Sequence, residues 1–130
     1  MGESLKEYIK NHPARGFRSQ PHYFQEGDFV AYYIKEDVAY EERIGELVTI
    51  YRSMKSNEMV GCKIKGLKRI MKTLGDFGML RVMIKDGKVS LGLLFMGAAL
   101  ANPGCQEEYG KYGKSFVDVP VDLAQLPKAA

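Results

Sequence analysis

Five basic residues between positions 63 and 72 come closest to a recognisable chemistry. They are Lys63, Lys65, Lys68, Arg69 and Lys72, and no acidic residue interrupts them. Such a patch could follow a nucleic-acid backbone, because lysine and arginine neutralise phosphate charge. No recognised nucleic-acid motif accompanies the run, so an ordinary solvated surface explains it at least as well. Nucleic-acid binding is therefore possible but not favoured.

Cysteine and histidine, the side chains that most often bind metals or perform catalysis, are few and far apart. No pair among His12, His22, Cys62 and Cys105 has the close spacing of a zinc site. Cys62 shares its strand face with apolar residues and is expected to be a small buried hydrophobe rather than a nucleophile. We predict no metal site, no cofactor and no catalytic residue, which makes a non-enzyme the favoured class.

The charged residues are nearly balanced but segregated along the chain. The 19 basic and 16 acidic residues leave a net charge of +3 over 130 residues, too little to indicate a nucleic-acid partner by itself. Acidic side chains gather around one predicted turn: Glu36, Asp37, Glu41, Glu42 and Glu46. Opposite charges on separate segments could pair with a second copy of the chain or with a charged partner, or could pair within one molecule.

The most apolar stretch, residues 91–100, is only ten residues long, whereas a membrane span takes roughly 18 or more. The polar first residues show no secretory signal, and the two cysteines are consistent with a reducing compartment. We therefore expect no membrane association and a cytoplasmic location.

Three segments predict antiparallel strands: 28–35 is dense in aromatic and β-branched residues, and the side chains of 46–53 and 58–66 follow a period of two. Residues 54–57 lie between the last two strands and suit a short hairpin loop, with Asn57 in a left-handed conformation. About residues 66–74 the period becomes helical, with Leu67, Ile70, Met71 and Leu74 on one stripe.

The flanking segments complete the expected element order. Asp86-Gly87 is typical of a hairpin turn and predicts two strands, at 79–85 and 88–96. A long loop is expected at 101–115, a last edge strand at 116–123, and a frayed end at 124–130.

The first 27 residues predict a short helix followed by a connection. Phe17, Tyr23 and Phe24 of that connection are expected to enter the core.

Neighbouring residues of a strand point to opposite faces, so Tyr32 and Tyr33 cannot both face the core. One of them could stand on an outer surface and contact a protein partner or a stacked base. Alternatively, Tyr33, Tyr51 and Met71 could line a small-molecule pocket between sheet and helix. The candidate aromatic surface or pocket is Tyr32, Tyr33, Tyr51 and Met71.

Residues 28–66 resemble a family of short bacterial domains of unknown function. The matching pieces are Asp28, Tyr33-Ile34, an acidic turn at Glu41-Glu42, and Met59-Val60-Gly61 followed by Ile64. The chain departs from the family at residues 52–56, where members carry an aspartate-rich turn. The resemblance implies a small sheet capped by a helix and a role in interaction.

Together these observations predict one α+β domain with a mostly antiparallel sheet of five to six strands and one principal helix. The leading function is a non-catalytic protein-interaction module that forms a homo-oligomer or binds another protein. The alternatives are a nucleic-acid-associated protein and a small-molecule-binding domain.

Overall fold

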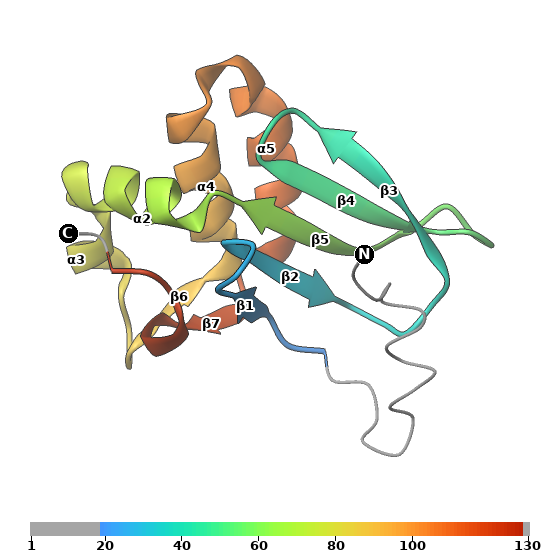
Figure 1. Ribbon diagram of the computed structural model, residues 1–130, viewed down its shortest axis with the longest axis horizontal. Coiled ribbons are helices and arrows are strands. Elements are labelled where there is room, and N and C mark those ends of the chain that lie inside the picture. Colours follow the sequence, from blue (N-terminus) through green and yellow to red (C-terminus); the bar gives the residue numbers. More distant parts are fainter. Residues whose placement is uncertain (1–18, 129–130) are drawn as a thin grey trace.

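A computed structural model describes residues 19–128 of the chain (Figure 1). Five strands form one antiparallel sheet in the order β1-β2-β5-β4-β3. The strands are β1 (His22–Phe24), β2 (Phe29–Tyr33), β3 (Ala39–Ile44), β4 (Val48–Ser53) and β5 (Met59–Lys65). This confirms the predicted α+β fold with an antiparallel sheet.

Four α-helices and a second, two-stranded sheet complete the described part of the chain. The helices are α2 (Leu67–Asp76), α3 (Met79–Met83), α4 (Leu91–Ala101) and α5 (Gln106–Gly113), and β6 (Lys88–Ser90) pairs with β7 (Pro120–Asp122). Short 3-10 turns occur at Pro103–Cys105, Lys114–Phe116 and Leu123–Gln125. The expectation of one principal helix was wrong, because α4 is as extensive as α2 and lies deeper.

The core lies between one face of the five-stranded sheet and helices α2, α4 and α5 (Figure 1). Alternate residues of the three inner strands supply the sheet side: Val30, Tyr32, Val48, Ile50, Cys62 and Ile64. The predicted stripe of α2, comprising Leu67, Ile70, Met71 and Leu74, is buried in the same core, where Ile70 and Leu74 lie against Gly97 of α4. The remaining side chains of each strand lie on the opposite face of the sheet, because successive side chains of a strand point to opposite faces. We call it the outer face.

The segment 79–96 was predicted as a hairpin of two strands, and only its turn and the first three residues of its second strand are correct. Asp86 and Gly87 have φ angles of 54° and 73°, as a two-residue turn requires. The residues before the turn form α3, and those after it form three residues of β6 and then α4. Residues 91–101 are apolar on all sides, so their pattern does not separate a buried helix from a strand. Ser90 begins α4 by accepting a hydrogen bond from the N–H of Leu93 at 3.0 Å.

Three further expectations about segments were wrong. The predicted loop at 101–115 contains α5, whose Tyr109 is fully buried. The edge strand expected at 116–123 is reduced to β7. Residues from 124 do not simply fray, since Leu126 is buried in the core.

The acidic region predicted as a turn contains the strand β3, and the predicted connection before residue 28 contains β1. Within that connection Tyr23 packs against the core as expected, whereas the Phe24 side chain is exposed. The predicted N-terminal helix and Phe17 lie outside the described residues.

Asp28 joins the start of β2 to the start of α2. Its carbonyl accepts from the N–H groups of Gly66 (3.0 Å) and Leu67 (3.3 Å), and its carboxylate accepts from the N–H of Lys68 at 3.2 Å. The N-cap position itself, Gly66, has no side chain to do this. An aspartate forty residues earlier therefore serves the helix N-terminus, where a negative charge is favourable.

We predict that Asp28→Ala lowers the free energy of unfolding by about 2 kcal/mol, because it removes this cap and places alanine at a φ of 53°. Asp28→Asn should cost less than about 1 kcal/mol, since asparagine caps helices and tolerates that φ. Urea denaturation measures both values, with Asp76→Ala at the exposed end of the same helix as the control. Equal losses for the alanine and asparagine variants would contradict the capping role.

Candidate interaction surfaces

The structure divides the predicted basic patch between two elements. Lys63 and Lys65 belong to β5 and stand on the outer face, away from the helices. Lys68, Arg69 and Lys72 are exposed on α2. Arg69 donates to the carbonyl of Ala101 at the end of α4, and Lys72 pairs with Asp76 at 2.9 Å. Two of the helix residues thus have structural partners, and only the strand lysines share a surface with aromatic rings.

The sheet also divides the predicted aromatic set. Tyr32 belongs to the core and meets the ring of Phe116 edge-on, with ring centroids 5.8 Å apart. Tyr33 and Tyr51 stack on each other on the outer face, with centroids 4.7 Å apart and 15° between the planes. Met71 is buried on the helix side. The expectation that Tyr32 and Tyr33 face opposite sides is confirmed, but the pocket predicted between Tyr33, Tyr51 and Met71 does not form.

Gly61 makes the tyrosine stack possible. It lies between Tyr33 of β2 and Tyr51 of β4 in the sheet register. A Cβ atom at this position would lie 3.1 Å from both Cα and Cδ1 of Tyr33 and would collide with the carbonyl oxygen of Tyr32. Burial raises the pKa of Tyr33 and Tyr51 above the ordinary tyrosine value, which itself leaves the hydroxyl protonated at neutral pH. The stack is therefore a neutral, packed feature of the outer face.

β3 is an unpaired edge of the sheet within the described residues. Hydrogen bonds alternate along antiparallel strands, and the N–H of Met54 donates to the carbonyl of Val38 at 2.8 Å, which sets the phase. In this register the even-numbered residues of β3 bond to β4. Ala39, Glu41 and Arg43 therefore direct their peptide groups away from the sheet, where the strand order ends.

Two polar contacts hold this edge strand in place. The Arg52 guanidinium of β4 binds Glu42 at 2.8 Å and also donates to the Tyr112 hydroxyl of α5 at 3.0 Å. Before β3 begins, the Ser53 hydroxyl donates to the carboxylate of Asp37 at 2.8 Å. The β3 edge is thus fixed both to its neighbouring strand and to the helix layer.

Helix α3 and the segments near it expose apolar side chains. The helix has no buried residue, and the exposed fractions of Val82 and Phe77 are 80% and 64%. Met83 and Val117 line an open cleft of about 330 Å³ beside the Asp86-Gly87 turn. Clustered apolar side chains of this kind are typical of protein-contact surfaces.

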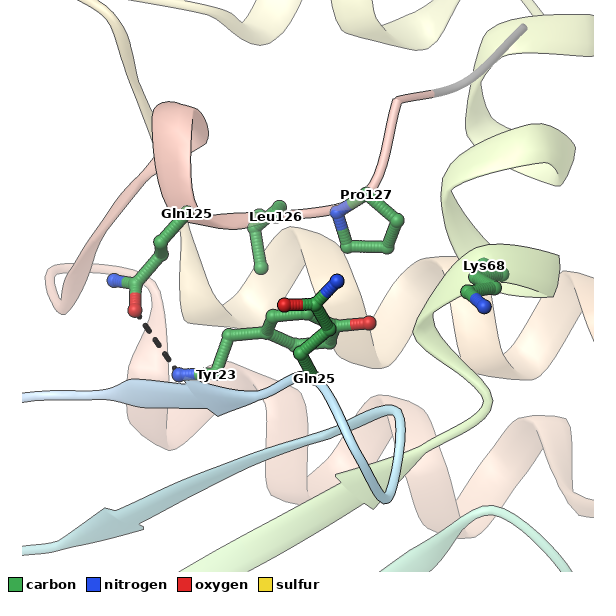
Figure 2. Close-up of a pocket in the computed structure, with 6 residues that line it drawn as sticks. All are labelled: Tyr23, Gln25, Lys68, Gln125, Leu126 and Pro127. Carbon is green, nitrogen blue, oxygen red and sulfur yellow. Dashed lines mark hydrogen bonds between the residues drawn. The ribbon is translucent and has the colours of Figure 1, made fainter.

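A second cleft, of about 310 Å³, lies where the β1–β2 turn, the start of α2 and the C-terminal segment meet (Figure 2). The side-chain oxygen of Gln125 accepts from the N–H of Tyr23 at 3.0 Å and closes one side. The Tyr23 hydroxyl donates to Asp28 at 2.6 Å, and burial together with this contact raises the pKa of Tyr23 to about 12. Lys68 contributes the one charged side chain of the lining, so the cleft offers an amine and amides but no paired acid and base.

Neither cysteine is placed for chemistry. Cys62 is fully buried in β5, and burial raises the pKa of its thiol. Cys105 is half-buried beside Asn102 and Tyr109. Between residues 19 and 128 no cluster of three or more metal-binding side chains occurs. Among the same residues no helix has the length and apolar character needed to cross a membrane.

Sequence reasoning missed two features of these surfaces. It treated Glu41 to Arg43 as part of a turn, because charged residues hid the strand. It also placed Phe24 in the core, although the ring lies on the outer face and stacks on Phe29. Period-two alternation of Phe24 with His22 is present but spans only three residues, which is too short a signal.

Comparison of the chain with protein-family models, with curated protein sequences and with solved structures found no match. The resemblance of residues 28–66 to a bacterial domain family stays a prediction.

We predict that Gly61→Ala lowers the free energy of unfolding by about 1–3 kcal/mol, because the added methyl group collides with β2. Gly110→Ala is the matched control. Gly110 is exposed within α5 and has open space beside it, so alanine should stabilise the helix by about 0.5–1 kcal/mol. Thermal and urea unfolding measure the change in stability of each variant. A Gly61→Ala variant as stable as the natural protein would contradict the close packing described for this position.

We also predict that Asp37 contributes to acid sensitivity. The Ser53 hydroxyl, helped by the N–H of Val38, holds the pKa of Asp37 below its ordinary value. A lowered folded-state pKa means that the stabilisation is present above the unfolded value of about 3.9 and is lost as the pH falls through the lower folded value. Urea unfolding of Asp37→Asn should therefore show a shallower fall in stability below about pH 4 than the natural protein. Parallel curves for the two proteins would exclude this contribution.

Proposed function

We propose that the chain is a non-catalytic interaction module that pairs with a second copy of itself through the free edge of β3. The observation that carries the proposal is the row of outward peptide groups on Ala39, Glu41 and Arg43. Unpaired strand edges are templates for pairing with another chain. The exposed apolar side chains around α3 are a further reason to favour protein partners.

The charges of β3 select one register for antiparallel self-pairing. The peptide groups of residues 39, 41 and 43 must face the second copy. Three antiparallel registers satisfy this condition and place Glu41 or Arg43 beside the two-fold axis that relates the copies. Two of them oppose like charges, either Glu41 with Glu41 of the partner subunit or Arg43 with Arg43 of the partner subunit. The third pairs Glu41 with Arg43 of the partner subunit twice, which is favourable across strands.

The same register also pairs side chains on the helix side of the sheet. Tyr40, whose side chain is 40% exposed, would lie opposite Ile44 of the partner subunit. Glu42 would face Glu42 of the partner subunit, a repulsion that the Arg52 guanidinium at 2.8 Å offsets in each copy. Cross-strand pairs contribute roughly 0.2–1 kcal/mol each, so the four favourable pairs sum to about 1–4 kcal/mol beyond the backbone bonds. A weak, concentration-dependent dimer is the expected result.

The other functions receive less support. A small-molecule site would have to use the cleft in Figure 2, since the predicted aromatic pocket does not form. Nucleic-acid binding by the full run of five basic residues is weakened by the division of that run between sheet and helix. The cytoplasmic location stays a prediction.

The self-pairing model makes a charge-swap prediction. Arg43→Glu and Glu41→Arg should each weaken association, because each variant opposes like charges in the favoured register. The double variant should restore it, because opposite charges then face each other again. Sedimentation velocity over a wide concentration range measures the effect, and Glu46→Lys in the adjoining turn is the control for charge reversal alone.

Amide hydrogen exchange supplies an independent readout. The N–H groups of Glu41 and Arg43 should become protected as concentration rises, whereas those of Tyr40, Glu42 and Ile44 should be protected at all concentrations. A natural protein that remains monomeric at millimolar concentration, or a double variant as weak as the single ones, would exclude this mode of pairing.

A further inference from the structure

One row of side chains crosses the outer face through all five strands without an acidic residue. The register aligns His22 with Ala31, Ala31 with Lys63, Lys63 with Thr49, and Thr49 with Arg43. Two cations and an imidazole thus lie on one line across the sheet. Adjacent strands are about 4.8 Å apart, and β4 lies between Lys63 and Arg43, so the backbones of these two residues are roughly 10 Å apart across the sheet.

A second row, beside the first, combines aromatic rings with a third cation. Phe24, Phe29 and Lys65 are aligned across β1, β2 and β5. The rings of Phe24 and Phe29 stack with centroids 4.8 Å apart, and His22 meets Phe24 edge-on at 4.6 Å. The ammonium group of Lys63 lies 4.4 Å from the centroid of Phe29. The aromatic cluster and the lysines therefore form one continuous surface.

The aromatic cluster is accessible, and the charged residues in the rows beside it are basic. The Phe24 side chain is 43% exposed although it belongs to a sheet. On the other side of the basic row lie Tyr33, Gly61, Tyr51 and Glu41, so the one carboxylate in the three rows stands at the far edge of the sheet. The face near β1, β2 and β5 thus favours a ligand that carries both negative charge and flat rings.

We propose that this part of the outer face binds single-stranded nucleic acid. Lys63 and Lys65 would contact phosphates, and a base would stack on the exposed ring of Phe24. Aromatic side chains beside cations are the usual means of binding single strands without sequence preference. A duplex hides its base faces inside its own stack, so it gains the phosphate contacts alone.

This inference does not depend on pairing through β3, because one copy contains the whole surface. It differs from the basic run in the sequence, since it excludes the α2 residues and adds aromatic rings. Lys68 and Lys72 of α2 are therefore matched controls for charge.

The test is fluorescence anisotropy of the full chain with a labelled mixed-sequence DNA strand of about 12 nucleotides, a length within the range of such sites. The same strand in a duplex and polyglutamate serve as comparison ligands. The single strand should bind more tightly than either. With two phosphate contacts, the logarithm of the binding constant should fall with the logarithm of salt at a slope of about −1.4.

Two pairs of variants separate the contributions. Lys63→Gln with Lys65→Gln should abolish most of that salt slope, whereas Lys68→Gln with Lys72→Gln should leave binding within about twofold. Phe24→Ala should weaken binding roughly five- to hundredfold at all salt concentrations, and Phe24→Leu should be nearly as weak because it lacks a ring. Thermal unfolding checks that each variant is folded.

Three results would overturn the proposal. They are no single-strand binding at low salt, duplex or polyglutamate binding as tight as the single strand, and an equal loss from the α2 pair and the β5 pair.

Discussion

The structure depends on β5 lying at the centre of the sheet with β2 and β4 antiparallel on either side. This position aligns three strands whose alternate side chains are apolar, so one face of the sheet is buried and the other is left for different residues. It also fixes where α2 can begin, because that helix follows β5 after a single glycine. Asp28 then ties the start of the helix to the neighbouring strand.

Gly61 shows how the same central strand shapes the outer face. On the core side, Cys62 fills the sheet interior, whereas at Gly61 the missing side chain lets tyrosines from both neighbouring strands lean inward and stack. The register of β4 against β5 is irregular at the next position, between Tyr51 and Arg52. Arg52 lies at this irregularity and donates to the Tyr112 hydroxyl of α5. The close packing of the outer face and the anchoring of β3 therefore involve adjacent residues of β4, Tyr51 and Arg52.

The sequence predicted the parts of the fold that local patterns determine. The strands near 28–35, 46–53 and 58–66 are rich in β-branched and aromatic residues, and the stripe of α2 is amphipathic, so their types were clear. Residues 91–101 lack any polar residue to indicate a period, and this is why α4 was mistaken for a strand. β3 was missed for the opposite reason, because its three central residues are all charged.

Other features could not be predicted from local patterns at all. The contact between Asp28 and the N–H of Lys68 joins residues forty positions apart, and only the folded chain brings them together. Likewise, alternation predicted that Tyr32 and Tyr33 oppose each other but not which of them faces the helices. The acidic and basic segments were correctly recognised as separate, but their arrangement depended on strand order. That order places the acidic segment at an edge and the lysines at the centre.

The two proposals concern adjoining parts of one sheet and affect each other. Antiparallel pairing of β3 would continue the sheet into the second copy and bring both outer faces to the same side. Glu41 would then bind Arg43 of the partner subunit, so the one carboxylate of the three rows would be neutralised. Arg43, a cation of the basic row, would be neutralised to the same extent, so the net charge of the face would not change and Lys63 and Lys65 of each copy would remain free. Pairing would thus place the free lysines of two copies on one continuous face, and by linkage an anionic strand that binds both copies would strengthen the pairing.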